Sequence, residues 1–231
     1  MKYRHVVVEG PIGVGKTTLA RSLAAHWGAR LVLEQPQENP YLARFYEHLG
    51  ASGHGRGNPM ALQTQLSFLF QRVEQLKDLS QPGMFEQGVV SDFLFAKDAI
   101  FALLNLGDED LALYRQIYRR HAAQAPAPDL VIWLQAEPDT LLARIRRRGL
   151  TMEGQIGEDY LRTLSDAYLR HFASHPRLPV LAINTEAFHP AEDGGDFRRL
   201  LERIDAYAGG FEFYDPPDRP GRVLQSLGRG A

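Results

Sequence analysis

The chain has 231 residues, of which 44% are hydrophobic and none is cysteine, and its formal net charge is -2. This length is enough for one α/β domain with a substantial core. The lack of cysteine excludes disulfides, thiol catalysis and cysteine-based zinc sites. No large basic field points to nucleic acid, and no apolar run approaches the ~18 residues that a membrane helix needs. We therefore expect a cytoplasmic protein with no nucleic-acid and no membrane partner.

Five short β-rich runs alternate with helical stretches. Their mostly continuous apolar character predicts a parallel sheet covered by helices on both faces. The expected strands are Tyr3–Glu9, Arg30–Leu33, Gly88–Ser91, Leu130–Leu134 and Val180–Ile183. The expected helices are Lys16–Trp27, Pro40–Leu49, Pro59–Leu79, Leu94–Leu106, Glu109–His121, Pro138–Arg148, Glu158–Phe172 and Phe197–Ala208. We predict a single domain over residues 1–208, a glycine-rich loop over residues 50–58 and an extended tail over residues 209–231.

The first expected strand leads into a glycine-rich motif and then a helix. Residues 10–17 read G-x-x-x-x-G-K-T, the pattern of a phosphate-binding loop in its proper setting. The glycines let backbone N–H groups converge, and the helix N-terminus adds partial positive charge. Lys16 would reach the outer phosphates and the Thr17 hydroxyl would help to hold Mg²⁺. The expected ATP-binding residues are Gly10, Gly13, Val14, Gly15, Lys16, Thr17 and Thr18.

Two carboxylates follow the ends of the second and third expected strands. Ligands of open parallel sheets bind at the carboxyl ends of the strands, so Glu34 and Asp92 should stand beside the phosphate loop. Glu34 could accept the proton of an attacking hydroxyl, or it could be a solvated turn residue. Asp92 could hold Mg²⁺ through water, or it could only cap the next helix.

The long helix over residues 59–79 places Gln65 and Arg72 seven residues apart, on one face. A glutamine amide matches the donor and acceptor edge of a base, although an aromatic stripe that includes Phe68 and Phe70 favours core packing. Asp98, six residues after Asp92, adds a further acceptor.

The helix that begins at Pro138 ends in a cluster of four arginines, with Arg144 and Arg148 one turn apart. Such a cluster can complement the helix dipole, but beside a phosphate loop it favours an anion-binding lid, which we place over about residues 144–156.

These segments, in this order, resemble the deoxynucleoside kinases, especially the bacterial deoxyadenosine/deoxyguanosine kinase type, over roughly residues 3–188. The resemblance implies a P-loop nucleotide-kinase fold with a five-stranded parallel sheet flanked by helices. It also implies transfer of the γ-phosphoryl of ATP, with Mg²⁺, to the 5′-hydroxyl of a deoxynucleoside for nucleotide salvage. A purine deoxynucleoside is the expected acceptor, and a homodimer the expected assembly.

The same resemblance implies roles for single residues. Glu34 corresponds to the general base for the 5′-hydroxyl, and Asp92 to the acidic position of an Asp/Glu-Arg-Ser motif. Glu153 corresponds to a glutamate on the deoxyribose 3′-hydroxyl, which Tyr41 or Tyr46 would share. The base would be bound by Gln65, Arg72 and Asp98, and the lid arginines would be Arg144 and Arg148.

The chain departs from the family pattern next to Asp92. Phe93 and Leu94 stand where the motif has Arg and Ser, and we hypothesise that Lys97 supplies the missing charge. Leu150 replaces a further lid arginine. The alternatives are a deoxycytidine-preferring kinase, a thymidylate-type nucleoside monophosphate kinase, and a non-catalytic P-loop ATP-binding regulator.

Overall fold

The computed structural model of the protein describes residues 2–52, 55–80, 88–190 and 193–216. In this part of the chain six strands form one parallel sheet, ordered β2-β3-β1-β4-β5-β6. The strands are β1 (His5–Glu9), β2 (Arg30–Val32), β3 (Val89–Ser91), β4 (Leu130–Gln135), β5 (Val180–Asn184) and β6 (Phe211–Tyr214). β1 lies inside the sheet and all five of its residues are buried, as a strand covered on both faces requires.

The sheet has one strand more than the five expected. β6 comes from the segment that we expected to be an extended tail, and it pairs in parallel with β5, from Val180 opposite Phe211 to Ile183 opposite Tyr214. Phe211 also places its ring against that of Trp133. The short run of β6 carries little signal of its own, and its pairing depends on the edge that β5 offers. Residues 217–231 of the expected tail lie outside the described residues.

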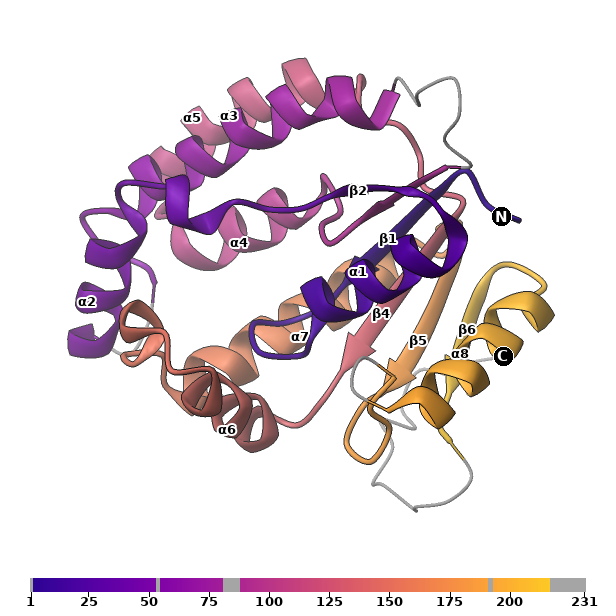
Figure 1. The fold of residues 1–231 in the computed structure, drawn as a ribbon. Helices are drawn as coiled ribbons and strands as arrows, with labels where there is room; N and C mark the ends of the chain where they lie inside the picture. Colours follow the sequence, from indigo (N-terminus) through magenta and orange to yellow (C-terminus); the bar gives the residue numbers. More distant parts are fainter. Residues whose placement is uncertain (1, 53–54, 81–87, 191–192, 217–231) are drawn as a thin grey trace, which may run out of the picture.

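Helices cover both faces of the sheet, with α1 in front of it and α7 behind it in Figure 1. The helices are α1 (Lys16–Trp27), α2 (Leu42–Ser52), α3 (Ala61–Ser80), α4 (Lys97–Asn105), α5 (Asp108–Ala122), α6 (Pro138–Arg148), α7 (Glu158–Ser174) and α8 (Gly194–Ala206). Two short 3-10 helices, η1 (Pro36–Glu38) and η2 (Thr151–Glu153), precede α2 and follow α6.

Several element boundaries differ from expectation by up to three residues, and α8, for example, begins at Gly194 and not at Phe197. α2 continues to Ser52, into the segment expected as a glycine-rich loop, of which residues 53–54 lie outside the described residues. α4 begins at Lys97 and not at Leu94. The backbone N–H of Leu94 donates instead to the Glu9 side chain, which holds the segment before α4 as a loop.

The phosphate loop is packed tightly between β4 and α6. Gly10 has φ +146°, and a Cβ there would lie 2.4 Å from the carbonyl oxygen of Leu134. Gly13 has φ +87°, and its Cβ would lie 2.8 Å from Cγ1 of Ile145. Only glycine fits either position, so the loop has a fixed place beside the helix that carries the lid arginines.

None of the helices among the described residues is both long and apolar enough to cross a membrane.

Candidate active site

The phosphate loop opens α1, with Gly15 at the N-cap in the left-handed conformation. Lys16 Nζ donates to the carbonyl oxygens of Gly10 and Pro11, at 2.8 and 2.9 Å. Burial lowers the pKa of Lys16 to about 8, and the nearby Lys97 adds to this effect. The Lys16 side chain therefore folds back on its own loop. A change of its rotamer would bring Nζ to an anion bound at the N-terminus of α1.

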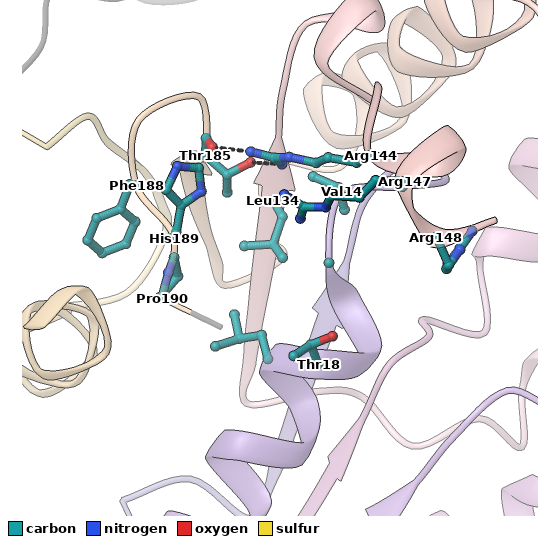
Figure 2. A pocket seen from close by; sticks show the side chains of 13 residues that line it. Val14, Thr18, Leu134, Arg144, Arg147, Arg148, Thr185, Phe188, His189 and Pro190 are labelled. Atoms are coloured by element: carbon teal, nitrogen blue, oxygen red, sulfur yellow. Dashed lines mark hydrogen bonds between the residues drawn. The ribbon is translucent and has the colours of Figure 1, made fainter. Parts of the chain in front are cut away.

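One cavity, of about 310 Å³, lies between the phosphate loop, α6 and the segment after β5, and we call it the outer cavity. Figure 2 shows lid arginines from α6 on one side of it, and Phe188, His189 and Pro190 from the segment after β5 on the other. Arg144 donates to the hydroxyl and the carbonyl oxygen of Thr185, at 3.0 and 2.6 Å. The remaining lining residues are Gly13, Val14, Gly15, Thr18, Leu19, Leu134, Arg147 and Arg148. Cations around a phosphate loop suit a nucleoside triphosphate.

A second cavity, of about 140 Å³, lies between the phosphate loop and helices α2, α3 and α4, and we call it the inner cavity. Gly13 and Arg148 line both cavities, so the two spaces meet at the phosphate loop and the lid. The second cavity is lined by twelve of the residues to which the sequence assigned a role, namely Gly13, Lys16, Thr17, Glu34, Tyr46, Gln65, Arg72, Asp92, Lys97, Asp98, Arg148 and Glu153. The structure thus gathers them from six segments of the chain: the phosphate loop with the start of α1, the segment after β2, α2, α3, the segment from β3 into α4, and the lid.

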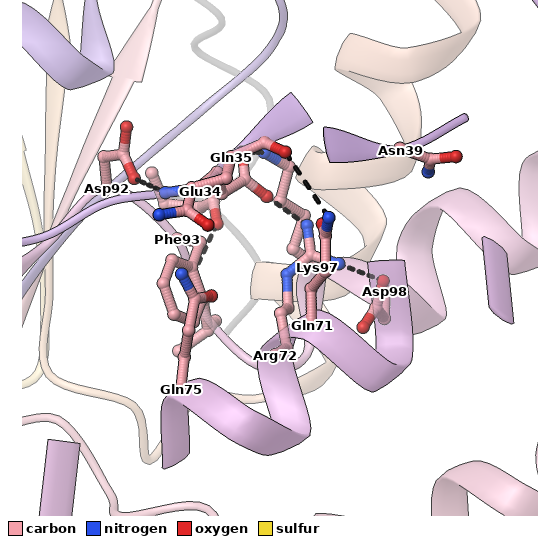
Figure 3. A network of polar contacts seen from close by, with 12 residues as sticks. Glu34, Gln35, Asn39, Gln71, Arg72, Gln75, Asp92, Phe93, Lys97 and Asp98 are labelled. Atoms are coloured by element: carbon pink, nitrogen blue, oxygen red, sulfur yellow. Dashed lines mark hydrogen bonds and ion pairs between the residues drawn. The ribbon is translucent and has the colours of Figure 1, made fainter. Parts of the chain in front are cut away.

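Glu34 is the centre of an ion-pair network, shown in Figure 3. Its Oε1 pairs with Arg72, and its Oε2 lies 2.5 Å from Lys97 Nζ. Burial alone would raise the pKa of Glu34, but Lys97 and Arg72 together lower it to about 2. Glu34 is therefore a permanent anion at neutral pH, held between two cations.

Arg72 joins this network to Asp98, because its second nitrogen pairs with Asp98 Oδ1. Burial raises the pKa of Asp98 to about 7, although the Arg72 charge opposes this. Asp98 Oδ2 and Gln65 Oε1 are buried and have no hydrogen-bond partner among the described residues. Two unpartnered acceptors in one cavity can be satisfied by a ligand that brings N–H donors.

Asp92 connects the phosphate loop to the segment of Glu34. Its Oδ2 accepts from the Thr17 hydroxyl at 2.5 Å, and its Oδ1 accepts from the backbone N–H of Glu34 at 2.8 Å. Burial, followed by the Glu34 charge, raises the pKa of Asp92. The described residues contain no group of three or more His, Cys, Asp or Glu side chains placed to hold a metal. One carboxylate and one hydroxyl fit Mg²⁺, which takes oxygen ligands from few protein groups and completes its shell with phosphates and water.

Glu153 and Tyr46 lie at the lid end of the second cavity. Glu153 in η2 pairs with Arg148, and Tyr46 on α2 is buried. The other tyrosine of the expected pair, Tyr41, is 37% exposed and lines neither cavity. The structure therefore brings Tyr46, and not Tyr41, beside Glu153.

Sequence reasoning gave no role to Glu9, which lies next to the phosphate loop and lines neither cavity. Glu9 ends β1 and is fully buried, and its side chain accepts hydrogen bonds from Gly10, Leu94 and Tyr168. A signal was available, because a charged residue at the end of an apolar buried strand needs partners. Residues 188–190 were also missed, since nothing local marks them, whereas Arg147 belongs to the arginine cluster that the sequence assigned to the lid.

The chain is similar to known proteins in sequence and in fold. The family model described as deoxynucleoside kinase matches residues 6–207. A deoxyguanosine kinase of Bacillus subtilis is 31% identical over 204 residues, covering 86% of this chain and 95% of that protein. A deoxyadenosine/deoxycytidine kinase of the same organism is 27% identical over 218 residues, covering 88% and 95%.

The fold matches that of a deoxyadenosine kinase from M. mycoides, solved with dCMP and dCDP bound. The two structures compare with a TM-score of 0.71 at 23% sequence identity, and the match covers 87% of this chain and 99% of that protein. The shared fold agrees with the family match over most of the chain. The chain belongs to the deoxynucleoside kinase family, whose members are enzymes that transfer phosphate to nucleosides.

Proposed function

We propose that this chain transfers the γ-phosphoryl of ATP to the 5′-hydroxyl of a deoxynucleoside, with a purine as the preferred base. The observation that carries this proposal is that two cavities meet at one phosphate loop, with the Glu34 carboxylate lining the inner one. A donor triphosphate in the outer cavity would point its last phosphate at an acceptor in the inner cavity. Holding the two reactants in line is most of what phosphoryl transfer asks of a protein.

On the donor side, the loop amides and Lys16 would hold the phosphates of ATP. Thr17 and Asp92 would hold Mg²⁺, which would neutralise charge on the transferred group. Arg144 and Arg148 would cover the triphosphate from α6. Arg144 would leave Thr185, and Arg148 would leave Glu153, to make these contacts.

On the acceptor side, Glu34 would accept a hydrogen bond from the 5′-hydroxyl. With a pKa of about 2 it is always ionised near neutral pH, but it is also a weak base. Its main contribution would therefore be to orient the hydroxyl. Lys97, which contacts Glu34 directly, would supply the positive charge that Phe93 does not.

The base would lie against α3 and the start of α4. Ionised Asp98 and the Gln65 carbonyl oxygen would accept from base N–H groups, and Arg72 would donate to a ring nitrogen or carbonyl. Similarity to a deoxyguanosine kinase and to a deoxyadenosine/deoxycytidine kinase supports a purine. Glu153 with Tyr46 would bind the 3′-hydroxyl of the deoxyribose.

Two exposed leucines support the pairing of two copies of this chain. Leu103 on α4 is 48% exposed and Leu113 on α5 is 46% exposed. We propose that these helices form the contact of a homodimer, and that the protein works in the cytoplasm.

An acceptor screen tests the proposed function. ADP release from ATP and Mg²⁺ is measured with each of the four deoxynucleosides, with their 5′-monophosphates, and with no acceptor. The proposal predicts release that depends on a deoxynucleoside and is greatest with deoxyguanosine or deoxyadenosine. Release only with monophosphates would identify a monophosphate kinase, and acceptor-independent or absent release would favour a regulator.

A further inference from the structure

The Glu9 side chain contacts both segments that carry the proposed Mg²⁺ ligands. It is the last residue of β1, and its side chain is 0% exposed. Oε1 accepts from the Gly10 backbone N–H at 2.8 Å and from the Tyr168 hydroxyl at 2.9 Å. Oε2 accepts from the Leu94 backbone N–H at 2.8 Å. One carboxyl group therefore joins the start of the phosphate loop, the loop after β3, and helix α7.

The backbone ladder between β1 and β3 ends before this point. The last paired residues are Val7 and Ser91, so the segments that leave the two strands have no ladder between them. The Glu9 side chain continues the connection, because it binds one backbone N–H from each segment. Its two oxygens set how far apart the segments lie.

The two segments carry the oxygen ligands proposed for Mg²⁺. Thr17 belongs to the loop and helix that begin at Gly10, and Asp92 lies two residues before Leu94. Their side chains are 2.5 Å apart, at Thr17 Oγ1 and Asp92 Oδ2. This spacing holds only if the two segments keep their relative position.

We infer that Glu9 is a positioning residue for the magnesium nucleotide: it holds the phosphate loop and the Asp92 segment in register so that Thr17 and Asp92 face the same ion. The inference rests on the proposed function, because it takes these two residues as the Mg²⁺ ligands. Loss of an interaction that orients a metal ligand commonly costs about 10- to 100-fold in metal affinity or activity.

The test compares Glu9→Gln with Tyr168→Phe. An amide in place of the carboxyl group turns one acceptor into a donor, so either Gly10 or Leu94 faces a donor and its segment is released. Tyr168→Phe removes one hydrogen bond from the same carboxyl group and leaves both backbone bonds in place. It is the matched control for loss of stability.

The measured quantities are the Kd of ATP with Mg²⁺, the Kd of ATP with EDTA, and the Tm of each protein. In Glu9→Gln we expect the Kd of ATP to rise about tenfold with Mg²⁺ and clearly less with EDTA. In Tyr168→Phe we expect a lower Tm and an unchanged Kd under both conditions. Glu9→Asp, which is one methylene too short to span both segments, should change the Kd in the same direction as Glu9→Gln.

An unchanged Kd in Glu9→Gln, an equal rise with and without Mg²⁺, or an equal rise in Tyr168→Phe would overturn the inference. Failure of both Glu9 variants to fold would also overturn it, since Glu9 would then serve folding alone. These experiments measure nucleotide binding and stability, so none of them depends on phosphoryl transfer. A wild-type protein that binds ATP but phosphorylates no deoxynucleoside would contradict the proposed function and not this inference.

Discussion

Lys97 Nζ lies 2.5 Å from Oε2 of Glu34, so the first residue of α4 neutralises the carboxylate that follows β2. A lysine in the first turn of a helix opposes the helix dipole, and Lys97 is also buried. Both features cost stability, and the contact with Glu34 offsets them. This placement is what the proposed role of Lys97, a positive charge for the transferred phosphoryl group, requires.

Lys97→Ala tests that role. We expect it to lower kcat more than it raises the KM for the nucleoside, because the charge acts mainly on the transferred phosphoryl group and not on the bound base. Lys97→Arg is the matched control and should restore part of the turnover. Steady-state kinetics with a saturating purine deoxynucleoside measures both, and an unchanged kcat in Lys97→Ala would place the missing charge elsewhere, most plainly in the lid.

Lys16→Ala should remove most activity and leave the fold intact. Lys16 Nζ donates to two carbonyl oxygens of its own loop, so its loss removes contacts within that loop and not core packing. Loss of a preorganised charge contact commonly costs about 100- to 1000-fold in rate. Turnover is compared with the melting curve of the same sample, and near-normal turnover in a folded variant would contradict the kinase mechanism.

Thymidine should be the poorest of the four deoxynucleosides. Its base has no exocyclic amine and offers a single N–H donor at N3, so at least one of the two unpartnered acceptors, Asp98 Oδ2 and Gln65 Oε1, would stay unpaired in the complex. An unpaired buried polar group costs about 1–3 kcal/mol, or more when it is charged. Catalytic efficiencies for the four nucleosides decide this. Thymidine in first place would refute the role of Asp98, and deoxycytidine in first place would refute only the purine preference.

The KM for an amine-bearing nucleoside should rise as the pH falls below about 7. Burial raises the pKa of Asp98 to about 7, so acid converts the acceptor into a neutral carboxyl group. Asp98→Asn should abolish this dependence. A KM that follows the same pH curve in wild type and Asp98→Asn would show that another group titrates.

The raised pKa of Asp98 also determines the direction in which stability changes with pH. Between the usual value of 3.8 and about 7, folded Asp98 binds its proton more tightly than the unfolded chain does. The free energy of unfolding contributed by this group therefore declines as the pH rises through that interval. Denaturant titrations of wild type and Asp98→Asn, compared at several pH values, measure the contribution. A rise of the wild-type value relative to the variant over this interval would contradict the sign.

Local signals in the sequence were sufficient for the phosphate loop, the eight helices and five of the strands. Glu34, Arg72 and Asp98 could be named one by one, but their mutual pairing joins residues 26 to 38 positions apart and depends on how α3 and α4 pack. β6 could not be predicted, because its strand character comes from pairing with β5. The position of Glu9 at the end of a buried strand signals that it needs partners, but the sequence does not show that these come from Gly10, Leu94 and Tyr168.

Glu34→Gln, with ATP affinity and kcat measured on the same protein, separates the binding of ATP from the transfer of its phosphoryl group to a nucleoside. The amide keeps the size of the side chain but loses the negative charge that orients the 5′-hydroxyl. We expect an ATP Kd close to that of wild type and a kcat lower by at least about 100-fold, because the acceptor hydroxyl is no longer oriented. A variant that binds ATP more weakly but turns over at the wild-type rate would contradict this role of Glu34.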